Sequence, residues 1–123
     1  MAQPVEYTVE ITATAGRHLS DLRKRLGKKV FLQLAQAIKN LSRDPEAKTQ
    51  SLAGKLSAYR SLHVSRCRVI VRIDDKIVRV IVVAAGWHTS GSRDDVYQAA
   101  IRLLEAGRLD PALPEPGDQT PDR

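Results

Sequence analysis

Apolar and polar residues alternate from residue 5 to residue 11, and this period of two predicts a half-buried first strand. Helical spacing follows, with its apolar positions at Ala15, Leu19, Leu22 and Leu26. A second helical stretch begins at once, and its apolar face is Val30, Phe31, Leu34, Ile38 and Leu41. Gly27 is expected to end the first helix in the αL conformation. Asp44-Pro45 is expected to end the second, because the residue before a proline disfavours helix. The pattern therefore predicts a helical hairpin.

Three more strands are predicted after a polar loop that runs through Gly54. Alternation over residues 61–64 and 67–73 indicates two consecutive strands, joined by a two-residue turn at Ser65-Arg66. Asp74-Asp75 suits a second two-residue turn. The β-branched run over residues 77–85 is typical of a central strand.

The second turn predicts how the last two strands pair. If Ile73 faces Lys76, paired residues share a face, and one face carries Arg68, Arg72 and Arg79 among Ile70, Ile77 and Ile81. The other face is wholly apolar: Cys67, Val69, Val71, Ile73, Val78, Val80 and Val82. We expect the apolar face to pack on the helical hairpin and the arginine face to point toward solvent or a ligand. A slip of one residue would bury three arginines, so it is rejected.

The segment Ser92-Arg-Asp-Asp95 has the form of a capping box and predicts a last helix that Gly107 ends. Its apolar positions include Val96, Ala100, Leu103 and Leu104. The predicted order is β-α-α-β-β-β-α. This is an α+β fold, in which a small, mostly antiparallel sheet packs on a helical hairpin and its other side is partly open.

Composition divides the chain into a body over residues 1–109 and a Pro-rich acidic tail over residues 110–123, which is expected to be disordered. The formal net charge is +6. Without the tail, 19 Lys and Arg stand against 10 Asp and Glu, a net charge of +9. A compact body this basic favours a polyanion or an acidic protein as partner.

Several function classes are not expected. Cys67 is the one cysteine, so an internal disulfide is impossible, and Cys/His spacing offers no zinc site. The start Met1–Pro4 has no signal-peptide character, and the longest apolar run, Val80 to Ala85, is too short to span a bilayer. We expect a cytoplasmic protein without a metal, a cofactor or a membrane contact.

Three segments carry a family resemblance: residues 52–75, Val80 to Gly86, and Asp95 to Tyr97. The first contains YRSLHVSRCRVIVRIDD over residues 59–75. Over residues 5–105 the chain resembles the RelE/ParE toxin superfamily of bacterial toxin–antitoxin systems. RNA-cutting and gyrase-poisoning members share these motifs.

The resemblance implies a metal-independent endoribonuclease that cleaves mRNA, often in the ribosomal A site, and so inhibits translation. In this reaction the ribose 2′-hydroxyl attacks the adjacent phosphate. A base must accept the hydroxyl proton, cations must stabilise the transition state, and an acid must protonate the departing 5′-oxygen. Arginine side chains can supply the positive charge without a metal.

The resemblance also suggests catalytic residues. Arg68 matches the strand arginine of the superfamily and is expected to bind the scissile phosphate. His88 stands where relatives place an arginine or histidine, and it could act as base or acid. Tyr97 matches a tyrosine used for proton transfer or substrate orientation. His63 should lie beside Arg68 and is the competing proton carrier.

Further residues have supporting or open roles. Arg60, Arg72 and Arg79 are expected to bind RNA phosphates. Some relatives present two lysines on the strand that here reads YRSLH, so Arg60 or His63 must replace them. Trp87 either packs at a strand end, which is favoured, or stacks on an RNA base. His18 is expected to be exposed.

Two other functions remain open. The chain could be a ParE-like inhibitor of DNA gyrase without catalysis, or an inactive relative that binds only an antitoxin. In every case we expect a cognate antitoxin, whose helix or extended segment covers the basic face or an apolar groove near the last helix. Operator DNA is reached only through that antitoxin, and mRNA or the ribosome is a partner only of the nuclease.

Overall fold

The computed structural model describes residues 5–110, and residues 111–123 of the predicted tail lie outside that range. The elements are β1 (Thr8–Ile11), α1 (Ala13–Leu26), α2 (Lys28–Lys39), η1 (Asn40–Ser42), α3 (Pro45–Lys48), β2 (Gln50–Ser51), η2 (Gly54–Leu56), β3 (Arg60–Val64), β4 (Cys67–Asp74), β5 (Arg79–Trp87) and α4 (Val96–Glu105). None of the helices in the described range is long and apolar enough to cross a membrane.

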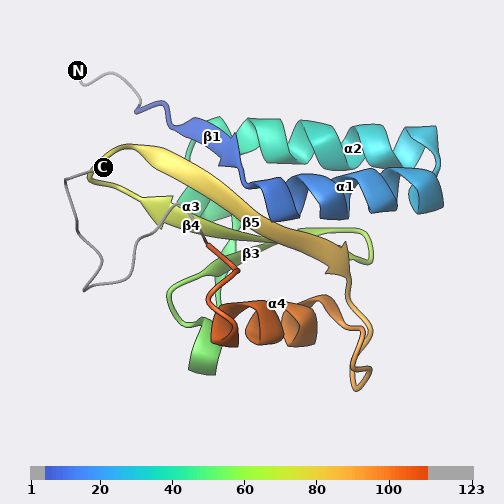
Figure 1. The fold of residues 1–123 in the computed structure, drawn as a ribbon. Coiled ribbons are helices and arrows are strands. Elements are labelled where there is room, and N and C mark those ends of the chain that lie inside the picture. The colour runs from blue at the N-terminus through green and yellow to red at the C-terminus, as the bar shows by residue number, and fades with distance from the viewer. Residues whose placement is uncertain (1–4, 111–123) are drawn as a thin grey trace.

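The five strands form one sheet in the order β1-β5-β4-β3-β2. β1 runs parallel to β5, while every other neighbouring pair is antiparallel. α1 and α2 cover one face of the sheet, and α4 lies against the other (Figure 1). This confirms the α+β fold with a small, mostly antiparallel sheet packed on a helical hairpin.

The predicted apolar face makes the larger core. Side chains of β4 and β5 pack there against the helical hairpin. The fully buried residues of this core include Ala15, Leu34, Cys67, Val69, Val71, Val80 and Val82. Burial of each large aliphatic side chain contributes about 1.5–3 kcal/mol, so this face holds the hairpin in place. The second face is more covered than expected, because Ile70, Ile81, Val83 and Ala84 pack under α4.

The predicted β4–β5 turn is wrong. Ile73 pairs with Val80 rather than Lys76, and a loop over residues 75–78 joins the strands. The Asp74 carboxylate accepts hydrogen bonds from the backbone N–H groups of Lys76 at 3.1 Å and Ile77 at 3.4 Å, which stabilises the longer loop. The observed partner of Ile73 is an even number of residues away from the predicted one, so the β4 side chains keep their predicted faces.

A bulge in β5 changes the faces beyond Val82. Val71 pairs with Val82 but Ile70 pairs with Ala84, which leaves Val83 as the extra residue. From there the alternation is shifted, so that Ala85 and Trp87 pack toward the hairpin. Gly86 consequently faces α4, where a Cβ atom would lie 3.2 Å from the Val96 Cβ.

His18 lies next to the part of β5 that follows the bulge. β1 ends at Ile11, opposite Val82, so the next N–H groups on that edge lack a strand partner. The Nδ1 atom of His18 accepts the hydrogen bond of the Ala85 N–H at 3.2 Å. Burial, with Arg17 nearby, lowers the pKa of His18 and so favours its neutral form. The expectation of a simply exposed side chain is therefore wrong.

The helix ends show which boundary signals were right. Thr12 caps α1 by accepting the Ala15 N–H at 3.1 Å. Gly27 ends α1 with a positive φ of 82°, but its ψ of 163° is not αL, so that detail is wrong. Pro45 opens α3, after helical turns that stop before Asp44.

The last helix begins later than the predicted capping box. Asp95 is its N-cap and accepts the Tyr97 N–H at 2.9 Å, whereas Ser92 belongs to the preceding turns. The box prediction is therefore wrong. Gly107 ends the helix as predicted, with a φ of 71° and hydrogen bonds from Gly107 and Arg108 back to the carbonyls of Leu104 and Leu103.

Candidate active site

Four segments meet at the end of the sheet that carries the β3–β4 turn. The two-residue turn at Ser65-Arg66 places His63 directly opposite Arg68, as predicted. β5 ends at the same place, and the backbone N–H of His88 donates to the Arg66 carbonyl at 2.8 Å. The start of α4 completes the group (Figure 1).

His88 is held by a buried carboxylate. Its Nδ1 lies 2.7 Å from Oδ1 of Asp95, whose side chain is 5% exposed. Burial favours the neutral acid, but hydrogen bonds from His88 and from the N–H groups of Thr89 and Tyr97 outweigh it and lower the pKa of Asp95. The ionised carboxylate can only accept, so Nδ1 of His88 is the donor, and in the neutral imidazole Nε2 is then the acceptor nitrogen.

Tyr97 lies beside this pair. Its ring packs edge-on against the His88 imidazole, with centroids 5.2 Å apart and planes at 72°. Its hydroxyl shares a hydrogen bond of 2.8 Å with the Ser61 hydroxyl on β3. The phenol is thus positioned by side chains from two elements.

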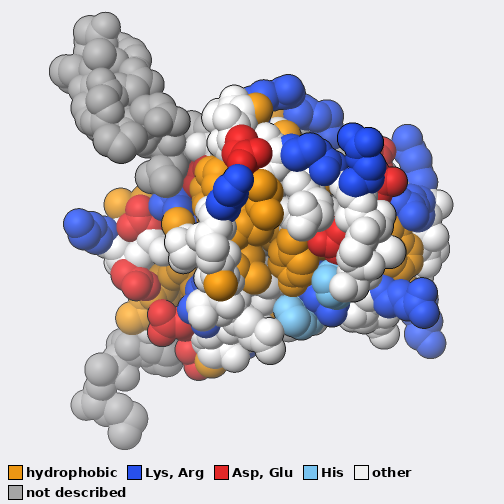
Figure 2. Space-filling view, turned by 90° about the horizontal axis from the view of Figure 1, so that it is seen from below, with side chains coloured by type: hydrophobic (Ala, Val, Ile, Leu, Met, Phe, Trp, Pro, Cys, Tyr) orange, Lys and Arg blue, Asp and Glu red, His pale blue; other side chains and the backbone are white. Residues whose placement is uncertain are grey.

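His63 lies on the same face of the sheet and is exposed. Partial burial and the nearby Arg68 and His88 side chains lower its pKa, so it is mainly neutral near pH 7. Figure 2, which looks onto the α4 side, shows two histidine side chains close together, and lysine and arginine side chains at the same end. This end can therefore both accept a proton and attract an anion.

Arg68 is oriented by its own turn. Its Nη1 donates to the carbonyls of Ser65 at 3.0 Å and Cys67 at 2.9 Å. Its Nε is buried and has no hydrogen-bond partner among residues 5–110. The guanidinium lines a hollow together with His88.

The three other arginines predicted to bind RNA do not join this group. Arg60 is on the hairpin side and donates to the side chain and carbonyl of Thr49 at 2.8 and 2.9 Å. Arg72 is buried and pairs with Asp110 at 2.6 Å and with Asp74 at 3.3 Å. Arg79 pairs with Glu10 at 3.0 Å, at the opposite end of β5. Arg68, Arg72 and Arg79 do share the predicted face of the sheet, but the expectation that this face points to solvent or a ligand is wrong for Arg72, which is buried.

Sequence reasoning missed Asp95 and Ser61 as members of the site. A capping box that starts at Ser92 puts Asp95 inside the first turn of the helix, whereas the helix begins after Asp95 and leaves its side chain free to contact His88. Ser61 lies two residues before His63 on the same face of its strand, and this alternation could have identified it as a member of the site.

Over the described range there is no cluster of three or more His, Cys, Asp or Glu side chains that could hold a metal.

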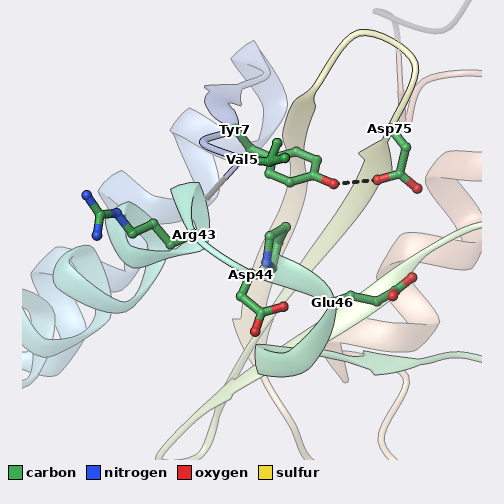
Figure 3. Close-up of a pocket in the computed structure, with 7 residues that line it drawn as sticks. Val5, Tyr7, Arg43, Asp44, Glu46 and Asp75 are labelled. Carbon is green, nitrogen blue, oxygen red and sulfur yellow. Dashed lines mark hydrogen bonds between the residues drawn. The ribbon is translucent and has the colours of Figure 1, made fainter. Parts of the chain in front are cut away.

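A second hollow lies at the opposite end of the sheet, between β1, α3 and the β4–β5 loop (Figure 3). Its labelled lining includes Asp44, Glu46 and Asp75, and the Tyr7 hydroxyl donates to Asp75 at 2.6 Å. That hydrogen bond raises the pKa of Tyr7. No histidine is among the residues that line this hollow, and its charged lining is mainly acidic, so it does not resemble the first site.

Comparison with known proteins matches the greater part of the chain. The profile of one family, described as ParE toxin of type II toxin-antitoxin system, parDE, matches residues 9–86. The search of curated proteins finds no match.

Solved structures share the fold. The toxin–antitoxin complex RelBE2 from Mycobacterium tuberculosis matches with 28% identity and a TM-score of 0.60, over 68% of this chain and 100% of that one. A mutant of the E. coli toxin RelE in the free state matches with 26% identity and a TM-score of 0.55, over 80% and 98%. The YoeB/ParE toxin from Agrobacterium tumefaciens matches with 20% identity and a TM-score of 0.56, over 67% and 99%.

Proposed function

The chain belongs to the ParE toxin family of type II toxin–antitoxin systems, and we propose that within it the chain is a metal-independent endoribonuclease that cleaves mRNA. One observation carries the proposal: His63, Arg68, His88 and Tyr97, from separate segments, meet at one end of the sheet. A histidine hydrogen-bonded to a buried carboxylate beside an arginine is the geometry expected of a general base.

The Asp95–His88 pair supports a role for His88 as general base. Nε2 of His88 takes the proton of the ribose 2′-hydroxyl, and the oxygen attacks phosphorus. A bond forms between O2′ and phosphorus while the bond from phosphorus to O5′ breaks. The products are a 2′,3′-cyclic phosphate and a free 5′-hydroxyl.

The remaining residues complete the reaction. Arg68 binds the phosphate and stabilises the negative charge that develops on its oxygens. The departing O5′ takes a proton from Tyr97, whose hydroxyl is held by Ser61, or from His63 after that histidine has been protonated. Single-stranded mRNA, free or on the ribosome, is the proposed substrate, in the cytoplasm.

A cognate antitoxin is the expected protein partner. The RelBE2 structure is itself a toxin–antitoxin complex. We propose that this chain's antitoxin is acidic, complements the +9 body, and links the toxin to operator DNA.

Gyrase inhibition is the second candidate, because the matching family is the one named for ParE. It requires a protein-binding surface but no acid or base. A gyrase inhibitor would therefore tolerate the loss of the His88 imidazole.

The test is to map mRNA 5′ ends in a bacterial translation extract after adding the protein, with a DNA-supercoiling assay in parallel. New ends are expected with the unsubstituted chain and with Arg102→Ala, a control on the exposed side of α4. They should disappear with Arg68→Ala and His88→Ala. Intact RNA with impaired supercoiling would replace the nuclease by the gyrase inhibitor, and no effect in either assay would indicate an inactive relative.

A further inference from the structure

We propose that Arg25, Arg66 and Trp87 form a second phosphate subsite beside Arg68, which holds an RNA phosphate next to the scissile one. The identity of the ligand as RNA rests on the proposed function. The existence of an anion site rests on the pocket itself, and three observations carry it.

The first observation is the charge of the hollow. It has a volume of about 530 Å³, and its lining is Arg25, Ser65, Arg66, Arg68, Trp87, His88 and Thr89. Three guanidinium groups thus line one hollow, and none of the described residues lining it is a carboxylate. Such a concentration of positive charge favours a phosphate group, which a planar guanidinium can bind through two parallel hydrogen bonds.

The second observation is a pair of donors without acceptors. Nε of Arg68 and Nε1 of Trp87 are both buried and have no hydrogen-bond partner among residues 5–110. Both residues line the same hollow. Buried donors are normally satisfied, and because each nitrogen has almost no exposed surface, an acceptor oxygen in this hollow would reach it only after a small shift of the side chain.

The third observation is the way Arg25 is held. Its guanidinium carbon lies 5.3 Å from the centroid of the Trp87 ring. This cation–π contact holds the Arg25 guanidinium beside the hollow, where its N–H groups can bind a phosphate. The ring also packs against the hairpin core, so its role is to position Arg25 rather than to stack on an RNA base.

The position of the hollow relates it to the chemistry. Arg68 and His88 line the hollow and also belong to the candidate active site. A single strand whose scissile phosphate lies on Arg68 therefore brings a neighbouring phosphate to Arg25 and Arg66. The subsite would fix the direction of the RNA across the His88 imidazole.

The chain offers a matched control. Arg23 is on the same helix and its guanidinium lies over Phe31 at 6.0 Å, away from this hollow. Arg23→Ala and Arg25→Ala thus remove the same charge from the same exposed helix end. Only the second removes a residue of the proposed subsite.

The test uses a dye-labelled single-stranded DNA oligonucleotide, which lacks the 2′-hydroxyl and so cannot undergo the proposed reaction. Binding to the full chain is followed by fluorescence anisotropy at several salt concentrations, and by the emission of Trp87, which is the sole tryptophan. Arg25→Ala should weaken binding about tenfold and reduce the salt slope by about 0.7, the value for one phosphate of a single strand. Arg23→Ala should retain the slope of the unsubstituted chain.

Two outcomes overturn the subsite: no binding by the unsubstituted chain, or equal affinity and slope for the two variants. The result is separable from that of the nuclease test. Binding that depends on Arg25 without RNA cleavage would leave the subsite and remove the nuclease. RNA cleavage together with oligonucleotide binding that does not depend on Arg25 would support the nuclease and remove the subsite.

Discussion

At the scale of single residues, Asp95 combines a structural and a proposed chemical role. One carboxylate caps α4 through the Tyr97 N–H and accepts from His88 and Thr89. The cap fixes the carboxylate relative to the helix, and the carboxylate in turn fixes the tautomer of His88. The same group therefore couples the start of α4 to the direction in which Nε2 of His88 points.

Replacement of Asp95 by Asn separates these two roles. Asn is also a good N-cap, so the melting temperature should change little. The neutral amide no longer imposes the Nδ1–H tautomer, and the rate of RNA cleavage should fall about 100-fold, in the range that general base catalysis supplies. Because Asp95 acts through His88, kcat should fall while KM is retained.

The control for this change is Asp94→Asn, an exposed neighbour whose carboxylate is outside the site. It should cleave RNA at the rate of the unsubstituted chain. Equal rates for Asp95→Asn and the unsubstituted chain, measured on one oligonucleotide, would contradict the positioning role.

At the scale of elements, alternation along the chain predicted the strands and their faces because side chains in a strand have a period of two. It predicted the His63–Arg68 pair for the same reason, through a two-residue turn. It could not predict the β4–β5 loop, which depends on hydrogen bonds to one carboxylate of Asp74. It also could not predict the bulge at Val83, because a bulge interrupts the period on which the prediction relies.

The bulge matters for the site, since it is what brings Gly86 and His88 to the α4 side. Without the extra residue, these positions would face the helical hairpin. The expected exposure of Arg72 is wrong for a related reason: a pattern along β4 and β5 does not show that Asp110, from beyond α4, pairs with the buried Arg72. Contacts made by distant segments are absent from local periodicity.

Gly86→Ala tests the contact between β5 and α4. The new Cβ would lie 3.2 Å from the Val96 Cβ, so the first turn of α4 must move. We expect a loss of about 1–3 kcal/mol in the free energy of unfolding, as for other overpacked cores. RNA cleavage should also fall, because Asp95 moves with the helix.

Gly16→Ala is the matching control, since nothing lies within 4 Å of a Cβ there and the residue is within α1. It should raise the free energy of unfolding, by about 0.5–1 kcal/mol. Denaturant unfolding of both variants measures these changes. Equal stability of Gly86→Ala and the unsubstituted chain would show that α4 is not packed against Gly86.

At the scale of the whole molecule, the end of the described chain is tied to the middle of the sheet. After α4, Leu109 is buried and Asp110 forms an ion pair with Arg72. The side chain of Asp110 is 3% exposed and that of Arg72 is 11% exposed. Asp110, the first residue of the predicted tail, therefore belongs to the packed body, and Arg72 has a partner within the fold rather than an RNA phosphate.

Arg72→Ala leaves the buried Asp110 carboxylate without its partner and should lower the free energy of unfolding by about 3–5 kcal/mol. Asp110→Ala should cost less, because Arg72 keeps its longer ion pair with Asp74 at 3.3 Å. The double variant should lose less than the sum, because neither charge is then left alone. If Arg72 instead bound RNA, Arg72→Ala would abolish cleavage and leave stability unchanged, whereas the ion pair predicts that the folded fraction of each variant still cleaves. Urea unfolding, with cleavage rates normalised to folded protein, distinguishes the two roles.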